Sequence, residues 1–258
     1  MPRIRSLRPL LISSVVAALI VACATSPTGR RQLRLVSDAE MAQMGAAAFQ
    51  ELKQKTPPTK NVKVNDYVQC VARAITREVG GDWEIQVFES KEVNAFALPG
   101  GKIGVYTGLL KVAENQHQLA AVIGHEVAHV LAGHSAARVS NQMAAQLGVA
   151  VLAGATGLSP EMIGMGANLL LVLPNSRADE TESDILGQQL MARAGFDPAQ
   201  ASQLWINMAK GAGGAPPQML STHPSPDTRI RDLNDNLPRV RPLYEQARAA
   251  GKRPNCAA

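Results

Sequence analysis

The segment His125-Glu126-Val127-Ala128-His129 carries two imidazoles four residues apart, with a glutamate directly after the first. On a helix, residues at i and i+4 share a face, so both rings can reach one metal ion. Two neutral nitrogens and one carboxylate form a donor set that zinc favours in catalytic sites, where one position stays open. The intervening glutamate would project beside the metal, within reach of an attacking water. The pattern therefore predicts a hydrolytic zinc site, provided that the segment is helical.

Apolar residues on both sides of this segment recur at helical spacing. Leu119, Val122 and Ile123 precede it and Val130 follows it, which is typical of a buried helix. The alternative is that both histidines are core residues bonded to backbone groups. Two buried rings and a buried glutamate would then all need polar partners, and unpartnered polar groups are costly to bury. We therefore expect a buried helix that carries metal ligands.

An acidic segment that begins at Ser176 offers a third ligand. Glu180 and Asp184 stand four residues apart and share one face of a helix, whereas Glu182 points away. We expect Glu180 to bind zinc and Asp184 to orient a liganding histidine through its other ring nitrogen. For Glu182 we expect a solvated charge near a helix start, where acidic residues are favoured.

Four sequence blocks together resemble a known family of zinc endopeptidases, related to the CAAX prenyl protease, HtpX and the Oma-type mitochondrial protease. Two of them are the H-E-x-x-H segment and the later E-x-x-x-D, in which Ser183 stands where the family usually has alanine. Residues 94–103 resemble the segment ahead of the active-site helix, and residues 221–229 resemble the T-H-P-x-x-x-x-R motif. The blocks keep the family's order over residues 92–232, and the similarity is greatest to periplasmic lipoprotein members of the LoiP and YcaL kind.

The resemblance implies a mostly helical, gluzincin-like α+β domain with a small β-sheet beside the active-site helix. It implies one zinc ion per chain, bound by His125, His129 and Glu180. Glu126 is then the general base, which accepts a proton from the attacking water and passes it to the leaving amine.

The T-H-P block contributes two candidate site residues, His223 and Arg229. We expect both to be catalytic, because either can supply positive charge to the developing oxyanion. In the family the equivalent histidine can instead occupy the open metal position and keep the enzyme latent, and both roles stay open for His223. Of the other histidines, we expect His134 to be structural and His117 to be exposed.

A short extended stretch, residues 94–98, precedes a Pro-Gly-Gly turn and a second extended stretch at 102–106. Such enzymes hold a polypeptide by adding it to an edge strand. Two small residues of the stretch would leave room for substrate side chains, and recognition through the backbone suits unfolded polypeptides. The expected substrate-binding residues are Asn94, Ala95, Phe96, Ala97 and Leu98.

The N-terminus has the features of an export signal. Residues 1–22 hold three arginines and then an uncharged, mostly apolar run, as a signal peptide does. The following Cys23 completes a lipobox and is the expected lipidation site, although an ordinary buried thiol is an alternative. Ala24 is not the aspartate that retains lipoproteins in the inner membrane. We therefore expect an outer-membrane lipid anchor facing the periplasm, with the inner membrane as the alternative, a tether over residues 23–36 and a peptidase domain over 37–258.

Composition bears on partners and on redox state. The formal charge is +5, and removing the three arginines of residues 1–22 leaves +2; aromatic residues make up only 3% of the chain. A nucleic-acid partner is therefore not expected. Cys70 and Cys256 remain, and an oxidising periplasm favours a disulfide between them. The alternative is one buried and one exposed free thiol.

The rest of the pattern predicts helices over residues 37–55, 62–79, 225–237 and 243–250, a further helix from residue 197, a strand over 83–88 and a loop at 211–217. Between Arg138 and Arg177 the only charged residue is Glu161. The ordinary interpretation of this apolar stretch, residues 139–176, is one or two core helices between the zinc-ligand helices. A mobile cover over the cleft, or a surface that touches a membrane or a partner, is the alternative.

These features predict a zinc endopeptidase that hydrolyses unfolded or misassembled envelope proteins. The alternative is a largely latent protease that acts as a chaperone or assembly factor at the outer membrane. In that case the outer-membrane assembly machinery is an expected partner.

Overall fold

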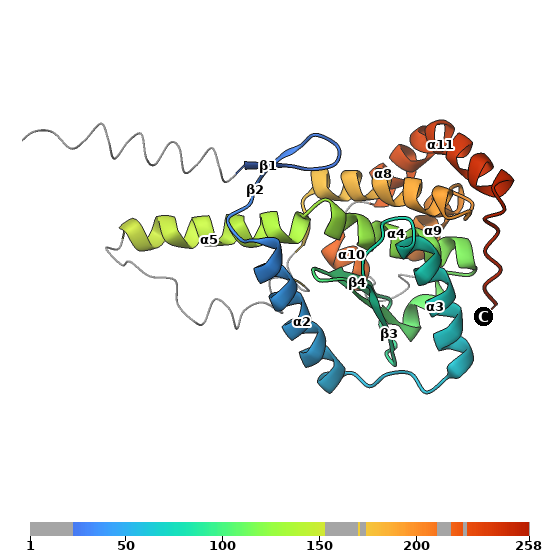
Figure 1. The fold of residues 1–258 in the computed structure, drawn as a ribbon, viewed down its shortest axis with the longest axis horizontal. Coiled ribbons are helices and arrows are strands. Elements are labelled where there is room, and N and C mark those ends of the chain that lie inside the picture. The colour runs from blue at the N-terminus through green and yellow to red at the C-terminus, as the bar shows by residue number, and fades with distance from the viewer. Residues whose placement is uncertain (1–22, 153–169, 171–173, 211–217, 224–225, 258) are drawn as a thin grey trace, which may run out of the picture.

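The computed structural model describes residues 23–152, 170, 174–210, 218–223 and 226–257 (Figure 1). Three predictions fall outside this part of the chain: the signal peptide, most of the second half of the apolar stretch, and the loop at 211–217. Helices predominate and the sheets are small, so the predicted α+β class is confirmed. No helix within the described residues is long and apolar enough to cross a membrane.

The main sheet of the fold has three strands and packs against the helix that carries the H-E-x-x-H segment. Its strands lie in the order β3 (Glu84–Phe88), β5 (Lys102–Tyr106) and β4 (Ala95–Leu98). β3 runs parallel to β5, and β4 runs antiparallel to it. The turn between β4 and β5 contains Gly100 and Gly101, both with positive φ, which glycine adopts without steric cost. This arrangement leaves β4 at an edge of the sheet, as the sequence predicted.

Two helices precede the sheet. α2 (Asp38–Lys55) begins at a capping box formed by Ser37 and Glu40, as its sequence indicated. α3 (Val62–Thr76) ends three residues before the predicted position. An aromatic cluster joins α2 to the sheet, with ring centroids 6.0–6.3 Å apart in edge-on and stacked pairs. The members of this cluster are Phe49, Phe88, Phe96 and Tyr106.

The helix that carries the H-E-x-x-H segment, α4 (Gln116–Leu131), is almost entirely buried. Its N-cap residue Asn115 accepts hydrogen bonds from the backbone N–H groups of His117 and Gln118. In Figure 1, α4 lies between the sheet and α8 (Arg177–Arg193), and α9 (Gln200–Lys210) packs beside it. The main hydrophobic core fills the space between α3, α4, α9 and the sheet. The helices α4 and α8 are thus anchored in the main hydrophobic core.

The apolar stretch begins as one helix, α5 (His134–Leu152). Gly133, with a φ of 70°, separates it from α4. The chain returns through the short α10 (Gln218–Thr222) to α11 (Pro226–Ala249).

The prediction of two C-terminal helices is wrong, because α11 is continuous through Pro238 and Pro242. A proline inside a helix removes a backbone donor and crowds the preceding turn. Both prolines are exposed and four residues apart, so they share one solvent-facing side. The opposite side buries Leu233, Val240 and Ala247, and this packing outweighs the local cost.

Residues 23–33 lie within the expected tether, and the structure describes them as a folded hairpin. β1 (Cys23–Thr25) pairs antiparallel with β2 (Arg31–Leu33), and the pair is called the N-terminal hairpin below. The loop between these strands packs against α8, where Thr28 and Arg30 contact Glu182. The folded part of the chain therefore begins well before residue 37.

A disulfide ties the C-terminal tail to α3. It joins Cys70 and Cys256, whose Cα atoms lie 5.8 Å apart. The backbone N–H of Cys256 also donates to Gln116 Oε1, at the start of α4. The tail thus closes against the helices of the main core.

Candidate metal centre and catalytic site

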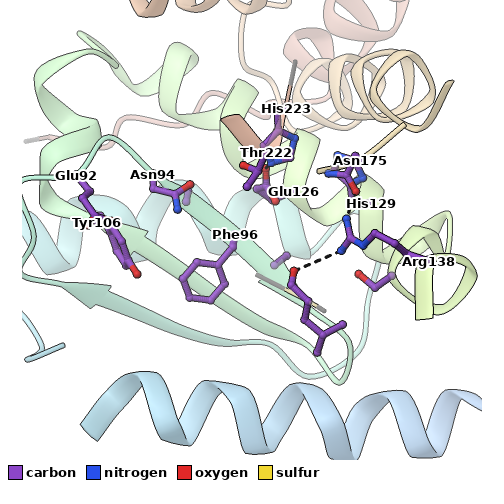
Figure 2. Close-up of a pocket in the computed structure, with 14 residues that line it drawn as sticks. Glu92, Asn94, Phe96, Tyr106, Glu126, His129, Arg138, Asn175, Thr222 and His223 are labelled. Atoms are coloured by element: carbon purple, nitrogen blue, oxygen red, sulfur yellow. Dashed lines mark hydrogen bonds and ion pairs between the residues drawn. The ribbon is translucent and has the colours of Figure 1, made fainter. Parts of the chain in front are cut away.

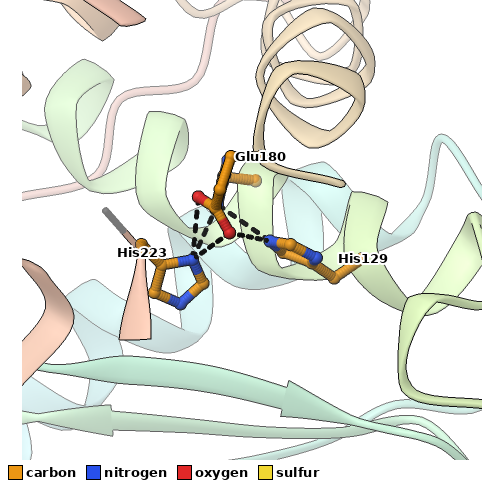
Figure 3. Close-up of side chains that lie close together, drawn as sticks. His129, Glu180 and His223 are labelled. Atoms are coloured by element: carbon orange, nitrogen blue, oxygen red, sulfur yellow. Dashed lines mark hydrogen bonds and ion pairs between the residues drawn. The ribbon is translucent and has the colours of Figure 1, made fainter. Parts of the chain in front are cut away.

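Four buried side chains from three segments converge on one point. Figure 3 shows three of them, His129, Glu180 and His223. His125 and His129 come from adjacent turns of α4, and Glu180 comes from the first turns of α8. His223 follows α10 directly. One ligand atom from each of the four lies within 4.8 Å of every other. The structure thus brings together the three ligands expected from the sequence and adds His223 to them.

The spacing of these atoms suits a tetrahedral zinc ion. His125 Nε2 lies 3.0 Å from His129 Nε2, 3.2 Å from His223 Nδ1 and 3.3 Å from Glu180 Oε2. His223 Nδ1 lies 2.9 Å from Glu180 Oε1. Zinc bonds near 2.0 Å require ligand atoms about 3.3 Å apart in a tetrahedron. Three imidazole nitrogens and a carboxylate oxygen at this spacing fit zinc in both chemistry and size.

Glu180 remains ionised at the centre of this cluster. Burial opposes ionisation, but the electrostatic interaction with His223 and hydrogen bonds with the three histidines hold the pKa of Glu180 well below its ordinary value. The site thus offers a metal one full negative charge surrounded by imidazoles.

Asp184 lies behind His125, as expected. Its Oδ1 is 3.0 Å from His125 Nδ1, so that nitrogen donates to it and Nε2 points its lone pair at the metal position. Burial and the positive charge of Arg229 oppose protonation of His125. In the metal-free protein its hydrogen bonds to Asp184 and Glu180 outweigh both and raise the pKa of His125 to about 9, so Nε2 must lose its proton when a metal binds. Glu180, a metal ligand, and Asp184, which orients the ligand His125, therefore lie one turn apart on α8.

Arg229 does not take the oxyanion role that we expected. Its guanidinium donates from Nε and Nη2 to both oxygens of Asp184, at 2.7 and 2.6 Å, and its Nη1 lies 2.8 Å from Glu180 Oε2. It also stacks 3.5 Å above the Trp205 ring and is 3% exposed. These contacts place Arg229 behind the ligands, outside the cleft lining. The geometry gives it a positioning role through Asp184 and Glu180.

The prediction that Glu182 is a solvated charge is wrong. Its side chain is 3% exposed and accepts from Thr28, Arg30 and His134. The helix face that points away from the metal is buried because the N-terminal hairpin covers it. Burial raises the pKa of Glu182, but hydrogen bonds with Ser26 and with these three neighbours outweigh burial and lower it to about 2.

His134 and His117 differ in how far they match expectation. His134 is structural in the sense that it is buried between Glu182 and His129, although it touches a ligand directly. His117 is half-buried against Phe196, where its Nδ1 accepts from a backbone N–H, so the prediction that it is exposed is wrong. Burial lowers the pKa of His117.

Glu126 faces a cleft beside the cluster (Figure 2). Its Oε1 is buried and makes no hydrogen bond within the described residues, while His223 Nε2 lies 3.4 Å away. His129 and His223 line the same cleft, together with four of the five residues expected to bind substrate: Asn94, Ala95, Phe96 and Ala97. A buried carboxylate oxygen that faces the cleft next to the metal position, without a hydrogen bond within the described residues, suits a group that handles a proton from water.

The edge strand β4 borders this cleft. The backbone carbonyl of Asn94 accepts a hydrogen bond from the backbone N–H of Tyr106 on β5. Two residues further along, Phe96 lies opposite Gly104 in the same register. In an antiparallel pair, residues alternate between hydrogen-bonded and non-bonded positions. The N–H and C=O groups of Ala95 and Ala97 therefore point away from β5, toward the open edge.

The side chains of the strand are placed differently from the expectation. Ala95 and Ala97 pack into the main core, while Phe96 and Leu98 pack into the aromatic cluster. The small side chains of Ala95 and Ala97 therefore allow close packing of β4 against α4, and they do not only leave room for a substrate. The backbone edge is the part of β4 available to a polypeptide.

Sequence reasoning missed Trp205, Thr28 and Arg30. Trp205 supports Arg229, and the other two support Glu182. No spacing rule connects them to the metal ligands, because each contact spans a long stretch of chain. The close spacing of Glu180, Glu182 and Asp184 was the one feature of the sequence that pointed to further charged partners. It did not show which residues would bind Glu182.

The fold and the site define a class of protein. Two histidines and a glutamate from one helix, with a second glutamate from another helix, form a cluster consistent with the zinc site of a metallopeptidase.

The pattern of peptidase family M48 matches residues 58–237, which is more than half of the chain. The chain therefore belongs to peptidase family M48. This confirms the resemblance at the level of the family.

Three relatives illustrate the similarity. The chain is 41% identical over 158 residues to the mitochondrial metalloendopeptidase OMA1 of Schizosaccharomyces pombe, covering 60% of this chain and 47% of the relative. It is 32% identical over 242 residues to OMA1 of Bos taurus, covering 84% and 45%. It is 26% identical over 223 residues to the beta-barrel assembly-enhancing protease of Escherichia coli, covering 80% and 45%. The chain thus spans about half the length of the curated relatives it matches.

Proposed function

We propose that this protein is a zinc endopeptidase that hydrolyses unfolded or misassembled cell-envelope proteins. The observation that carries the proposal is the convergence of His125, His129 and Glu180 next to Glu126, whose buried Oε1 makes no hydrogen bond within the described residues and has His223 Nε2 3.4 Å away. Bound zinc would lower the pKa of a water and polarise the peptide carbonyl. Glu126 is placed to accept the proton of the attacking water and to return it to the leaving amine.

The open edge of β4 supports a polypeptide substrate. Backbone groups of Ala95 and Ala97 can pair with an extended chain laid antiparallel or parallel to the strand. The buried Asn94 Oδ1, which has no hydrogen-bond partner within the described residues, can accept from a substrate N–H at the same edge. Main-chain recognition is indifferent to most side chains, so it selects for extended, unfolded segments.

Three observations support an envelope location. The sequence of residues 1–23 has the form of a lipoprotein signal, as members of the LoiP and YcaL kind have. The Cys70–Cys256 disulfide suits an oxidising compartment. Several relatives are named for β-barrel assembly. We propose an outer-membrane lipid anchor on Cys23 that faces the periplasm, with the assembly machinery of that membrane as a partner.

Two experiments test these proposals. Purified protein should cleave unfolded casein, and removal of the metal by a chelator should stop cleavage until zinc is restored. Cleavage that persists in metal-free protein would contradict the enzymatic proposal. Separately, Cys23→Ser should move the protein from the membrane fraction to the soluble periplasmic fraction, and an unchanged membrane fraction would contradict lipid anchoring.

The position of His223 favours a second function, that of a largely latent protease acting as a chaperone or assembly factor. His223 Nδ1 lies within 3.2 Å of both His125 Nε2 and Glu180 Oε1, where it completes the tetrahedral set. A side chain in this position competes with water and substrate. If this state dominates, wild-type protein should protect an unfolded envelope protein from aggregation without cleaving it, and a variant without this imidazole should cleave it.

A further inference from the structure

Glu182 receives more hydrogen bonds than a surface carboxylate needs. Its Oε1 accepts from the backbone N–H and the hydroxyl of Thr28, at 3.3 and 2.5 Å. Its Oε2 accepts from Arg30 Nε at 2.9 Å and faces His134 Nε2 at 3.1 Å. Two of these donors, the Thr28 backbone N–H and the Arg30 Nε–H, have a fixed direction and each faces a different oxygen, so only a group that accepts on both oxygens satisfies the site.

A continuous line of buried contacts leads from Glu182 to the metal centre. His134 Nε2 faces Glu182, and His134 Nδ1 lies 2.8 Å from His129 Nδ1. His129 Nε2 points at the other ligands. The three side chains are 1–6% exposed, so water does not compete for these positions.

The metal fixes the direction of every proton in this line. To bind zinc through Nε2, a neutral imidazole must carry its proton on Nδ1. His129 Nδ1 is therefore a donor, and His134 Nδ1 must be the acceptor. The proton of His134 then lies on Nε2, where Glu182 accepts it.

We propose that Glu182 and His134 are positioning residues that hold His129 in the tautomer able to bind zinc, with the N-terminal hairpin holding Glu182 in place. His125 meets its carboxylate, Asp184, directly. His129 reaches its carboxylate through a second histidine. Partners of this kind raise metal affinity because they orient the ring before the metal binds. The inference rests on the zinc site and is independent of which substrate the enzyme takes.

The first test is Glu182→Gln, with zinc affinity measured by competition against a chromophoric chelator. The amide of glutamine has one oxygen that accepts and one NH₂ group that donates. In one orientation the NH₂ group faces the donors of Thr28, and in the other it faces the donors of Arg30 and His134, so one set of hydrogen bonds is lost in either case. The expected result is zinc affinity about 10- to 100-fold weaker, with the circular dichroism of the metal-free protein unchanged. The matched control is Glu84→Gln, which removes an ion-paired carboxylate of the sheet and should leave zinc affinity unchanged.

The second test compares two replacements of His134. Asn carries an oxygen near the place of Nδ1 and can still accept from His129, whereas Phe fills the ring space and cannot. His134→Asn should keep most of the zinc affinity that His134→Phe loses. Equal zinc affinity in the two variants and in wild type would overturn the proposal, because a merely structural ring would not depend on that one acceptor.

A third measurement needs no variant and stands even if the replacements fail to fold. In zinc-loaded wild-type protein with ¹⁵N-labelled histidine, the ring nitrogen shifts report which nitrogen carries the proton. We expect His129 to be protonated on Nδ1 and His134 on Nε2. A proton on His134 Nδ1 would contradict the proposal directly.

Discussion

Gly124 of α4 and Gly187 of α8 bring the backbones of the two ligand helices into contact. A Cβ placed on Gly187 would lie 2.7 Å from the backbone nitrogen of His125, and one on Gly124 would lie 2.9 Å from the carbonyl oxygen of Gly187. No side chain separates the helices at this point. Because the helices approach so closely, Glu180 and Asp184 can reach the imidazoles on α4.

Gly187→Ala should therefore push α8 away from the zinc ligands. Overpacking of this kind costs roughly 1–3 kcal/mol in the free energy of unfolding, and the displaced Glu180 should weaken zinc binding. Chemical denaturation of the metal-free protein and zinc competition measure the two effects. Gln189→Ala, on the same helix, is the matched control and should change neither. A Gly187→Ala variant with wild-type values of both would show that the close contact is not needed.

The buried ion pair of Arg229 and Asp184 leads to a second prediction. Arg229→Met removes one partner and leaves two buried carboxylates without their cation. The expected loss is about 3–5 kcal/mol in the free energy of unfolding of the metal-free protein. Arg231→Met removes an exposed arginine of the same helix, whose ion pair with Asp232 contributes little. Similar stabilities of the two variants would contradict the positioning role of Arg229.

Local patterns in the sequence were enough to predict the parts of the site that lie within one helix. The i, i+4 spacing of His125 and His129, and of Glu180 and Asp184, follows from helix geometry alone. The capping box at Ser37 and the turn between the extended segments 94–98 and 102–106 are likewise short-range features. Each depends on residues that are close in the sequence.

The errors concern contacts made over long distances in the chain. The face of α8 that carries Glu182 looked solvent-exposed because its cover, the hairpin loop with Thr28 and Arg30, lies about 150 residues earlier. The continuity of α11 through Pro238 depends on tertiary packing that a local rule does not include. Arg229 was assigned to the oxyanion because its buried partners could not be read from spacing.

The disulfide gives a third prediction, on stability. Cys70 and Cys256 are 186 residues apart in sequence, so the bond restricts a long loop in the unfolded chain. Cys70→Ser should lower the free energy of unfolding by roughly 2–5 kcal/mol under oxidising conditions. Denaturation of wild type and variant, each with and without a reductant, measures this. Peptide mapping without reduction that finds both thiols free would remove the basis for the prediction.

His223 gives a fourth prediction, because its position in the cluster favours the latch over the oxyanion role. His223→Ala should raise the rate of casein cleavage, since the fourth metal position then opens to water. A donor to the oxyanion would have the opposite effect, and its loss would slow turnover by about 100- to 1,000-fold. Initial rates of the two proteins on the same substrate separate the roles. A slower variant contradicts the latch, and an unchanged rate contradicts both roles.

The most direct test of the account is Glu126→Gln, measured for zinc content and for cleavage together. The amide cannot accept the proton of the attacking water, while His125, His129 and Glu180 remain in place. We predict one zinc ion per chain and cleavage of unfolded casein reduced by about 100-fold or more. A variant that retains zinc and cleaves at the wild-type rate would contradict the assignment of Glu126 as the base, and with it the proposed mechanism.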